Sequence, residues 1–254
     1  VEVAREAAAL LSEGWGHAGV VRSKTLDKDL VTEWDTRVEE QIIAELRRRT
    51  PNVRIVAEEG GERGDAASSD RWLVDPLDGT VNFAHGLPVF AVSIGYARGA
   101  RIDAGAVIAP ALGWVFAAAR GAGATCNGEP IHVSPTGSLA RSLLATGFPY
   151  DRAVSAQNNF AEFVHLQRVA GAVRRLGAAS LDLCFVARGW LDGYWEMKVK
   201  PWGVAAGAFI VEEAGGRVSA IGGGPFDPDR GEVVATNGAI HEALVAALAA
   251  APAL

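Results

Sequence analysis

The sequence has few of the residues that build disulfide or zinc scaffolds. Its 254 residues include only two cysteines, Cys126 and Cys184, which show no CxxC spacing and could form at most one bridge. Two buried thiols in a reducing compartment are the better interpretation. The five histidines are scattered and never stand four residues apart, so a zinc site has little support.

Basic charge and long apolar runs are also scarce. Lys and Arg number 24 against 30 Asp and Glu, so the formal net charge is −6. A general nucleic-acid binder carries a basic face, and we therefore expect no nucleic-acid partner. No apolar run approaches the ~18 to 20 residues of a membrane-spanning helix, and no signal peptide is visible. We expect a cytoplasmic protein with no membrane partner.

The first part of the chain predicts two helices followed by antiparallel strands. Residues 2–14 are Ala-rich with helical periodicity. Thr36 and Glu39 form a capping-box pattern before a second amphipathic helix that stops at Pro51. From about residue 89 to 119, strand-like runs are broken by turn residues, which predicts an antiparallel meander.

The later part alternates strands and helices from about residue 142 onward, which is typical of an α/β arrangement. The composition turns polar around residues 134–139, and we place a boundary there. We therefore expect an N-terminal α+β half at 1–138 with an antiparallel sheet. A C-terminal α/β half at 139–254 would complete the functional site. With 49% hydrophobic residues, the chain can bury a large core.

The most informative segment is WLVDPLDGTVNF at 72–83. An apolar strand delivers Asp75 to its carboxyl end, and Pro76 then forces the chain out of the sheet. Asp78 follows three residues later, where a turn can bring its carboxylate beside Asp75, and the Leu77 carbonyl can face the same point. Gly79 allows the backbone to approach a ligand closely.

These groups are the ligands of a hard cation. Carboxylates with a carbonyl, and without His or Cys, fit magnesium better than zinc. Glu58 and Glu59 also end a strand and could complete the cluster. The N–H groups of Gly79 and the following Thr80 can be aimed at an anion, and two metals near 4 Å apart would clamp a phosphoryl transfer.

Plainer interpretations exist for each fragment. DPLDGT contains the usual turn residues, and Glu58-Glu59 alone is more often a solvated loop. The pattern of an EF-hand is absent.

Several motifs in order resemble the inositol monophosphatase family, within the lithium-sensitive sugar-phosphatase superfamily. The order and spacing hold over nearly the whole chain, which is more specific than a single motif. The matching segments are AEEG at 57–60, WLVDPLDGTVNF at 72–83, GATCNGEPIHVS at 123–134, the segment 174–196 and PWGVAAGAFIVEEAGG at 201–216.

The resemblance implies a fold of the α/β (α+β) class, a layered α-β-α-β-α sandwich, usually a homodimer, with Mg²⁺ as cofactor and lithium sensitivity. It also assigns roles by position. The implied metal ligands are Glu58, Asp75, the Leu77 carbonyl and Asp78. The implied catalytic residues are Glu58, Thr80 and Asp35, which would share and orient a metal-bound water. The implied substrate-binding residues are Asp78, Gly79, Thr80, Gly177, Ala178, Ala179 and Glu196. Lys24 matches a family lysine near a mobile loop, and a surface lysine is an equal alternative.

One departure concerns Gly203. The family motif reads W-D-x-A-A-G, whereas this chain has Gly203 where the family places a metal-binding aspartate. The position resembles a helix N-cap, where Gly in place of Asp costs only a few tenths of a kcal/mol. We expect the fold to tolerate the change and the catalytic rate to fall.

The leading hypothesis is a phosphoric monoester hydrolase that acts on a small phosphorylated polyol or sugar, with inositol-1-phosphate as first choice. Alternatives in the same family are a histidinol-phosphate, sugar or nucleotide phosphatase. A catalytically weak phosphate-binding or scaffold protein is favoured by Gly203. A nucleic-acid or transcription accessory role lacks a basic patch.

Overall fold

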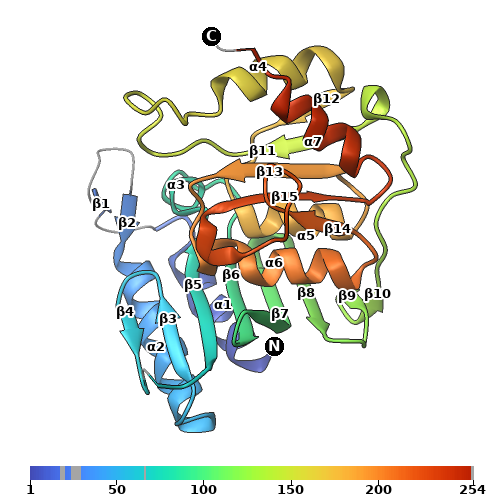
Figure 1. The fold of residues 1–254 in the computed structure, drawn as a ribbon. Coiled ribbons are helices and arrows are strands. Elements are labelled where there is room, and N and C mark those ends of the chain that lie inside the picture. Colours follow the sequence, from blue (N-terminus) through green and yellow to red (C-terminus); the bar gives the residue numbers. More distant parts are fainter. Residues whose placement is uncertain (18–20, 24–29, 66, 253–254) are drawn as a thin grey trace.

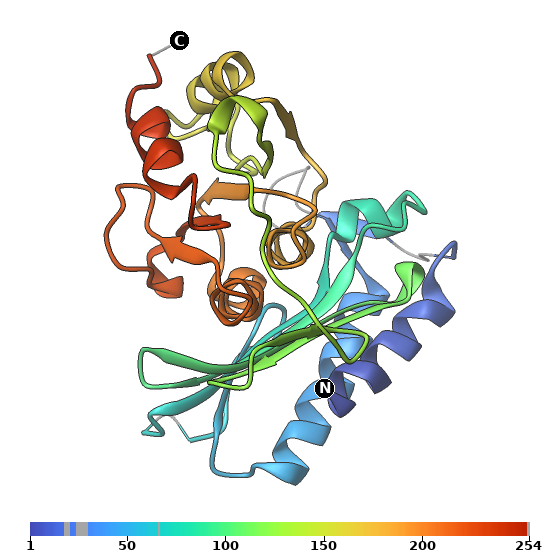
Figure 2. The ribbon, with the colours of Figure 1, turned by 90° about the vertical axis from the view of Figure 1, so that its right-hand side faces the viewer.

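Two β-sheets and three helical layers alternate in the computed structural model, in the order helix, sheet, helix, sheet, helix (Figure 2). The structure describes residues 1–17, 21–23, 30–65 and 67–252. The chain begins in the helical layer below the larger sheet and ends above the smaller one (Figure 1). This arrangement confirms the predicted sandwich. Within the described ranges, no helix is long and apolar enough to cross a membrane.

The layer below the larger sheet consists of α1 (Glu2–Gly14) and α2 (Glu33–Arg49). Buried residues recur every three to four positions in both helices, so each presents one apolar stripe. These stripes pack on each other and on the larger sheet in a single core cluster. The short hairpin of β1 (Val21–Ser23) and β2 (Leu30–Thr32) precedes α2.

The start of α2 differs from the prediction. The cap is Thr32, whose hydroxyl accepts a hydrogen bond from the Trp34 N–H at 3.2 Å, while the Asp35 carboxylate accepts from the Thr32 N–H at 2.7 Å. The predicted Thr36–Glu39 box was wrong because this reciprocal pair begins the helix four residues earlier. Glu39 instead lies buried inside α2.

The larger sheet has eight strands in the order β10-β9-β8-β7-β6-β5-β3-β4. All neighbours are antiparallel except β3 and β5, which run parallel. The run from β6 to β8 is the meander expected from the sequence. The bounds are β3 (Arg54–Ala57), β4 (Gly61–Arg63), β5 (Asp70–Asp78), β6 (Ala91–Arg98), β7 (Arg101–Ala109), β8 (Trp114–Ala119), β9 (Ala124–Cys126) and β10 (Glu129–Pro130). The one-turn helix α3 (Thr80–Ala84) follows β5 directly.

The smaller sheet is mixed, with the order β12-β11-β13-β15-β14. The strand β11 lies parallel to both its neighbours, and β15 is antiparallel to both of its own. The bounds are β11 (Leu143–Thr146), β12 (Ala172–Arg174), β13 (Gly193–Met197), β14 (Arg217–Ser219) and β15 (Glu232–Thr236). Helices α4 (Phe160–Val169) and α7 (His241–Ala249) cover its outer face (Figures 1 and 2).

Helices α5 (Ala179–Ala187) and α6 (Pro201–Glu213) form the middle layer between the sheets (Figure 2). Both are apolar around most of their circumference, as expected for helices covered on two sides. Glycines permit their close approach: a Cβ on Gly207 of α6 would lie 2.7 Å from Leu183 Cβ of α5. The first turns of both helices therefore sit at fixed positions against the end of β5.

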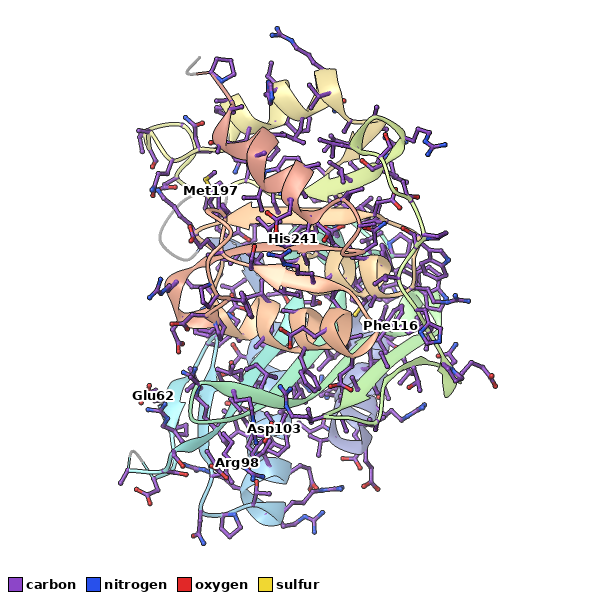
Figure 3. All side chains as sticks on the ribbon, turned by 45° about the vertical axis from the view of Figure 1, so that its right-hand side comes forward. Glu62, Arg98, Asp103, Phe116, Met197 and His241 are labelled. Atoms are coloured by element: carbon purple, nitrogen blue, oxygen red, sulfur yellow. The ribbon has the colours of Figure 1, made fainter. Side chains whose placement is uncertain are left out.

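His241 supports the smaller sheet from its outer side (Figure 3). It is fully buried, with Nδ1 3.0 Å from Thr236 Oγ1 and Nε2 2.9 Å from Ser219 Oγ. Burial lowers the pKa of His241, so the neutral ring links β14 to β15. This contact is structural, because His241 does not line the cavity described below.

Replacing Gly105 with alanine should destabilise the protein. The added Cβ would lie 2.8 Å from the Ala206 backbone oxygen, and a backbone atom of a buried helix cannot rotate away. We expect the free energy of unfolding to fall by ~1 to 3 kcal/mol in a denaturant titration. Gly137→Ala is the matched control, because a Cβ there meets no atom within 4 Å. Equal stability of the two variants would contradict the close packing of α6 on β7.

Candidate active site

The strand β5 carries two carboxylates to the inner end of the larger sheet. Asp75 is 5% exposed, and its Oδ1 accepts a hydrogen bond from the Leu77 N–H at 3.2 Å. The register between β5 and β6 shifts between Asp75 and Asp78, at the point where Pro76 has no N–H to donate. The predicted exit of the chain from the sheet at Pro76 was wrong: β5 continues to Asp78, which pairs with Ala91 beyond a local irregularity that accommodates the missing N–H.

Glu58 reaches the same place from the neighbouring parallel strand. Ala57 at the end of β3 pairs with Val74, and the Glu58 N–H donates to the Val74 carbonyl at 3.3 Å. The turn after Glu58 is held by Glu39 of α2, whose carboxylate accepts from the Glu59 N–H at 2.7 Å and the Gly60 N–H at 2.5 Å. Glu39 is thus a positioning group for this turn, a role that differs from the helix cap predicted for it from the sequence.

Thr80 and Asp35 meet as the resemblance implied. The Thr80 hydroxyl lies 3.1 Å from Asp35 Oδ1 and 3.0 Å from the Leu77 carbonyl oxygen. Its one proton is therefore directed at these acceptors, and its lone pairs remain available to a water. Gly79, before α3, has φ +90, and a Cβ there would lie 2.8 Å from the Val89 oxygen, so glycine is required on both counts.

Asp78 joins β5 to the first turn of α5. It accepts from the Ala179 N–H at 3.2 Å, the Ser180 N–H at 2.7 Å and the Ser180 hydroxyl at 2.5 Å. Helix N-termini attract negative charge through these free N–H groups. Ser180 was missed at the sequence level, because no pattern links it to a residue a hundred positions earlier.

One cavity of ≈ 440 Å³ collects the residues named from the sequence. Asp35 lies behind Thr80 and does not line it. The predicted residues in its lining are Glu58, Asp75, Leu77, Asp78, Gly79, Thr80, Gly177, Ala178, Ala179 and Glu196. Further residues in its lining include Gly147, Arg175, Asp182 and Gly203. The cavity thus lies where the larger sheet, α5, α6 and β13 meet.

The smaller sheet forms one wall of the cavity, and Glu196 of β13 lies in that wall. Its carboxyl group lies directly over Gly147, where a Cβ would overlap the glutamate oxygens. It accepts a hydrogen bond from the buried Tyr194 hydroxyl. Burial raises the pKa of Glu196 to about 7, partly offset by the Tyr194 hydroxyl.

Gly203 faces the carboxylate cluster. A Cβ at this position would have one neighbour within 4 Å, the Oδ2 of Asp75 at 3.4 Å. A side chain at this position would therefore begin beside Asp75, and its Cβ would clash with no other atom. The expectation that Gly203 is an N-cap was wrong: the cap is Lys200, Pro201 opens α6, and Gly203 lies in the first turn. Proline is favoured at this first position, which shifts the helix start upstream.

Several buried carboxyl groups at the cavity have raised pKa values. Burial, followed by repulsion from Glu58 and Asp78, raises the pKa of Asp75 well above its ordinary value. Burial raises the pKa of Asp78 to about 6, opposed by hydrogen bonds from Ser180. Burial likewise raises the pKa of Asp35. Buried carboxylates that repel one another are stabilised by a bound cation.

The oxygen atoms at this end of the cavity are of the chemical type that binds a hard cation. Carboxylate oxygens of Glu58 and Asp75 and the Leu77 carbonyl are the oxygen ligands that magnesium prefers. Among the residues that the structure describes, no three His, Cys, Asp or Glu side chains form a ready metal cluster. Asp78 is turned onto α5 by its three hydrogen bonds. Lys24 lies outside the described residues.

Comparison with known proteins identifies the family of this chain. A sequence model of the inositol monophosphatase family matches residues 1–253. The chain is 46% identical over 258 residues to an inositol-1-monophosphatase of Synechocystis sp., covering 99% of this chain and 89% of that protein. It is 40% identical to a protein named Nus factor SuhB of Pseudomonas aeruginosa, covering 96% and 92%.

The solved structures agree in fold. An inositol monophosphatase from Anabaena (Nostoc) superposes with a TM-score of 0.91 at 42% sequence identity. The match covers 100% of this chain and 94% of that one. Identity at this level and coverage of both chains show common family membership as well as a common fold.

Magnesium should raise the thermal unfolding temperature more at pH 8 than at pH 5.5. The pKa values of Asp78 and Glu196, about 6 and about 7, exceed ordinary values near 4. The folded protein then binds more protons than the unfolded chain between about pH 4 and pH 7, and metal-free stability falls as the pH rises through that window. A cation that binds ionised carboxylates offsets this loss.

The check is a pair of thermal melts at each pH with EDTA or with Mg²⁺, with KCl at matched ionic strength as control. Equal magnesium shifts at both pH values, or none at either, would contradict the assignment of the cluster as a cation site.

Proposed function

The chain belongs to the inositol monophosphatase family of phosphoric monoester hydrolases, and we propose that it hydrolyses inositol-1-phosphate or a closely related polyol phosphate with Mg²⁺. One observation carries this proposal. Glu58, Asp75 and Asp78 line the same cavity as Thr80 and the hydroxyl-accepting Glu196. A phosphate site and a polyol site thus adjoin within a volume suited to a small ligand.

Each residue has a proposed task. Glu58, Asp75, the Leu77 carbonyl and Asp78 would hold magnesium. Bound Mg²⁺ supplies charge for the phosphoryl oxygens and acidifies water. Glu58 accepts a proton from the attacking water. Thr80 accepts a hydrogen bond from that water, because the Thr80 hydroxyl proton is directed at Asp35 and the Leu77 carbonyl.

Other residues that line the cavity would contact the substrate. The N–H groups of Gly79 and Thr80 bind the phosphate, as backbone donors do at turns and helix starts. Glu196 accepts a hydrogen bond from a ring hydroxyl, and Tyr194 holds its carboxyl in place. Backbone and small side chains at Gly177, Ala178 and Ala179 form the side of the cavity that faces the polyol.

Other substrates of the same reaction class are alternatives. Histidinol phosphate, sugar phosphates and nucleotide phosphates present the same phosphoryl group, and a protein weakened by Gly203 could bind phosphate with little turnover. We favour inositol because Glu196 suits a hydroxyl-rich ring. Lithium sensitivity, a homodimer, a cytoplasmic location and the division into halves at 1–138 and 139–254 belong to the same proposal.

A nucleic-acid role is the second candidate, because relatives such as that of Pseudomonas aeruginosa are named Nus factor SuhB. The net charge of −6 opposes it. Salt-dependent binding of the protein to RNA would favour this role, since phosphate contacts weaken as salt rises.

Gly203→Asp should raise turnover at least tenfold, or ~1.4 kcal/mol. The aspartate would point at Asp75 and add a charged ligand for a second Mg²⁺, and loss of a charge-stabilising group typically lowers rates on the order of a hundred- to a thousandfold. Phosphate release would be measured on inositol-1-phosphate, histidinol phosphate, a sugar bisphosphate and adenosine bisphosphate. Calorimetry would give the magnesium stoichiometry.

Gly203→Asn is the matched control, since it adds the same volume without charge. Equal activity and equal metal stoichiometry in the original chain and Gly203→Asp would mean that another residue replaces the missing ligand. Release from none of the four substrates by either protein would remove the proposed activity itself.

Asp78→Asn should weaken Mg²⁺ binding at least tenfold and abolish phosphate release, because the amide lacks the anionic oxygen that a hard cation prefers. Ser180→Ala is the control, since it removes a hydrogen bond to Asp78 and leaves the carboxylate. An unchanged magnesium affinity of Asp78→Asn, measured by calorimetry on a variant with normal circular dichroism, would overturn the ligand assignment.

A further inference from the structure

Asp182 is a buried carboxyl group whose Oδ1 has no hydrogen-bond partner among the described residues. It lies in α5, is 1% exposed, and its Oδ1 is among the few buried side-chain atoms of the described residues that lack a partner. Buried polar groups are nearly always hydrogen-bonded. Asp182 also lines the cavity, so a bound ligand can supply the donor that the protein does not.

Asp192 shows that the fold can satisfy a buried aspartate where it needs one for structure. The Asp192 carboxylate accepts from the Leu143 N–H at 2.7 Å and from the Ser134 hydroxyl, and it is 7% exposed. Asp192 does not line the cavity. The contrast between the two aspartates separates a structural carboxyl from one that faces a ligand site.

Asp182 shares its end of the cavity with Glu196. Each of these carboxyls feels the charge of Arg175, which lines the same wall, and repulsion from Glu196 adds to burial in raising the pKa of Asp182. Tyr194 donates to one oxygen of Glu196. The two carboxyls together therefore leave several acceptor positions for ligand groups.

We propose that Asp182 is a specificity-determining residue that forms, with Glu196, a subsite for two hydroxyl groups of a polyol phosphate. This inference rests on the proposed phosphatase function of the same cavity. It places the polyol ring against α5 and β13 while its phosphate lies at Thr80.

Hydroxyl groups fit this subsite better than charged groups do. A second phosphate would face two carboxyls. An ammonium group would face Arg175, and the raised pKa of Asp182 favours its neutral acid form over the anion that an ammonium requires. A neutral hydroxyl can both donate to and accept from such a carboxyl, so it satisfies Asp182 in either protonation state.

The structure also assigns Asp182 an unusual effect on stability. Because its Oδ1 has no partner in the described part of the chain, removing the carboxyl relieves a burial penalty. Asp182→Leu is therefore expected to keep or raise the thermal unfolding temperature of the ligand-free protein. At a satisfied carboxyl even the isosteric change Asp192→Asn is expected to lower it.

The test compares two substrates that share a phosphate and differ in hydroxyls, inositol-1-phosphate and p-nitrophenyl phosphate. In Asp182→Leu, kcat/KM for inositol-1-phosphate should fall at least tenfold, and kcat/KM for p-nitrophenyl phosphate should change less than threefold. The kcat/KM of Asp182→Asn for inositol-1-phosphate should lie between the values of Asp182→Leu and the original chain, because one acceptor oxygen remains. Asp192→Asn should leave the ratio of the kcat/KM values for the two substrates unchanged.

Equal losses on both substrates, or an unchanged ratio with a lower unfolding temperature, would overturn the subsite. If the original chain hydrolyses neither substrate, the proposed function fails and calorimetry still decides the subsite. With Mg²⁺ present, inositol-1-phosphate should bind more tightly than inorganic phosphate. In Asp182→Leu the ratio of these two affinities should fall at least tenfold. Equal affinity of the original chain for both ligands would overturn the subsite on its own.

Discussion

Mutual repulsion among buried carboxylates at the end of β5 is the constraint on which the site depends. Asp75 and Glu58 are brought together by the parallel pairing of β3 with β5, and Asp78 follows at a break in the ladder. Such a cluster opposes folding unless its charge is compensated. The protein compensates Asp78 with three hydrogen bonds from the start of α5. Asp75 accepts a hydrogen bond from the Leu77 N–H, and the proposed cation would add opposite charge beside it.

The layered architecture makes this cluster possible. The larger sheet and the turn after β3 supply the clustered carboxylates. Behind them, Asp35 of α2 accepts from the Thr80 hydroxyl, and Glu39 of α2 accepts from N–H groups of the turn. Gly207 lets α6 pack closely on α5, and Gly105 of β7 lets α6 approach the larger sheet. These helices bring Ser180 and Gly203 against the end of β5. The smaller sheet adds Glu196 opposite. Each wall of the cavity thus comes from a different layer, so its shape depends on the packing of the whole sandwich.

The sequence predicted the family and, through that resemblance, the layers, because ordered motifs are local signals that survive without a structure. It also brought Asp35, Glu58, Asp75 and Thr80 into one hypothesis. It failed where a hydrogen bond between neighbours outweighed a formal pattern, as with Thr32 in place of Thr36, and where Pro201 moved the start of α6 away from Gly203. Ser180 and Asp182 escaped notice because their roles depend on contacts between distant segments, and within an apolar helix Asp182 carries no pattern of its own.

The central claim is that Glu58, Asp75 and the Leu77 carbonyl form a divalent-cation site beside the phosphate-binding turn. Crystals grown with Mn²⁺ in place of Mg²⁺ and with inorganic phosphate would test it most directly, because manganese is located by its anomalous scattering. The account predicts an anomalous peak bounded by these three groups, with phosphate against the Gly79 and Thr80 N–H groups. A fully ordered cavity without manganese, or manganese bound elsewhere with phosphate remote from Thr80, would contradict it.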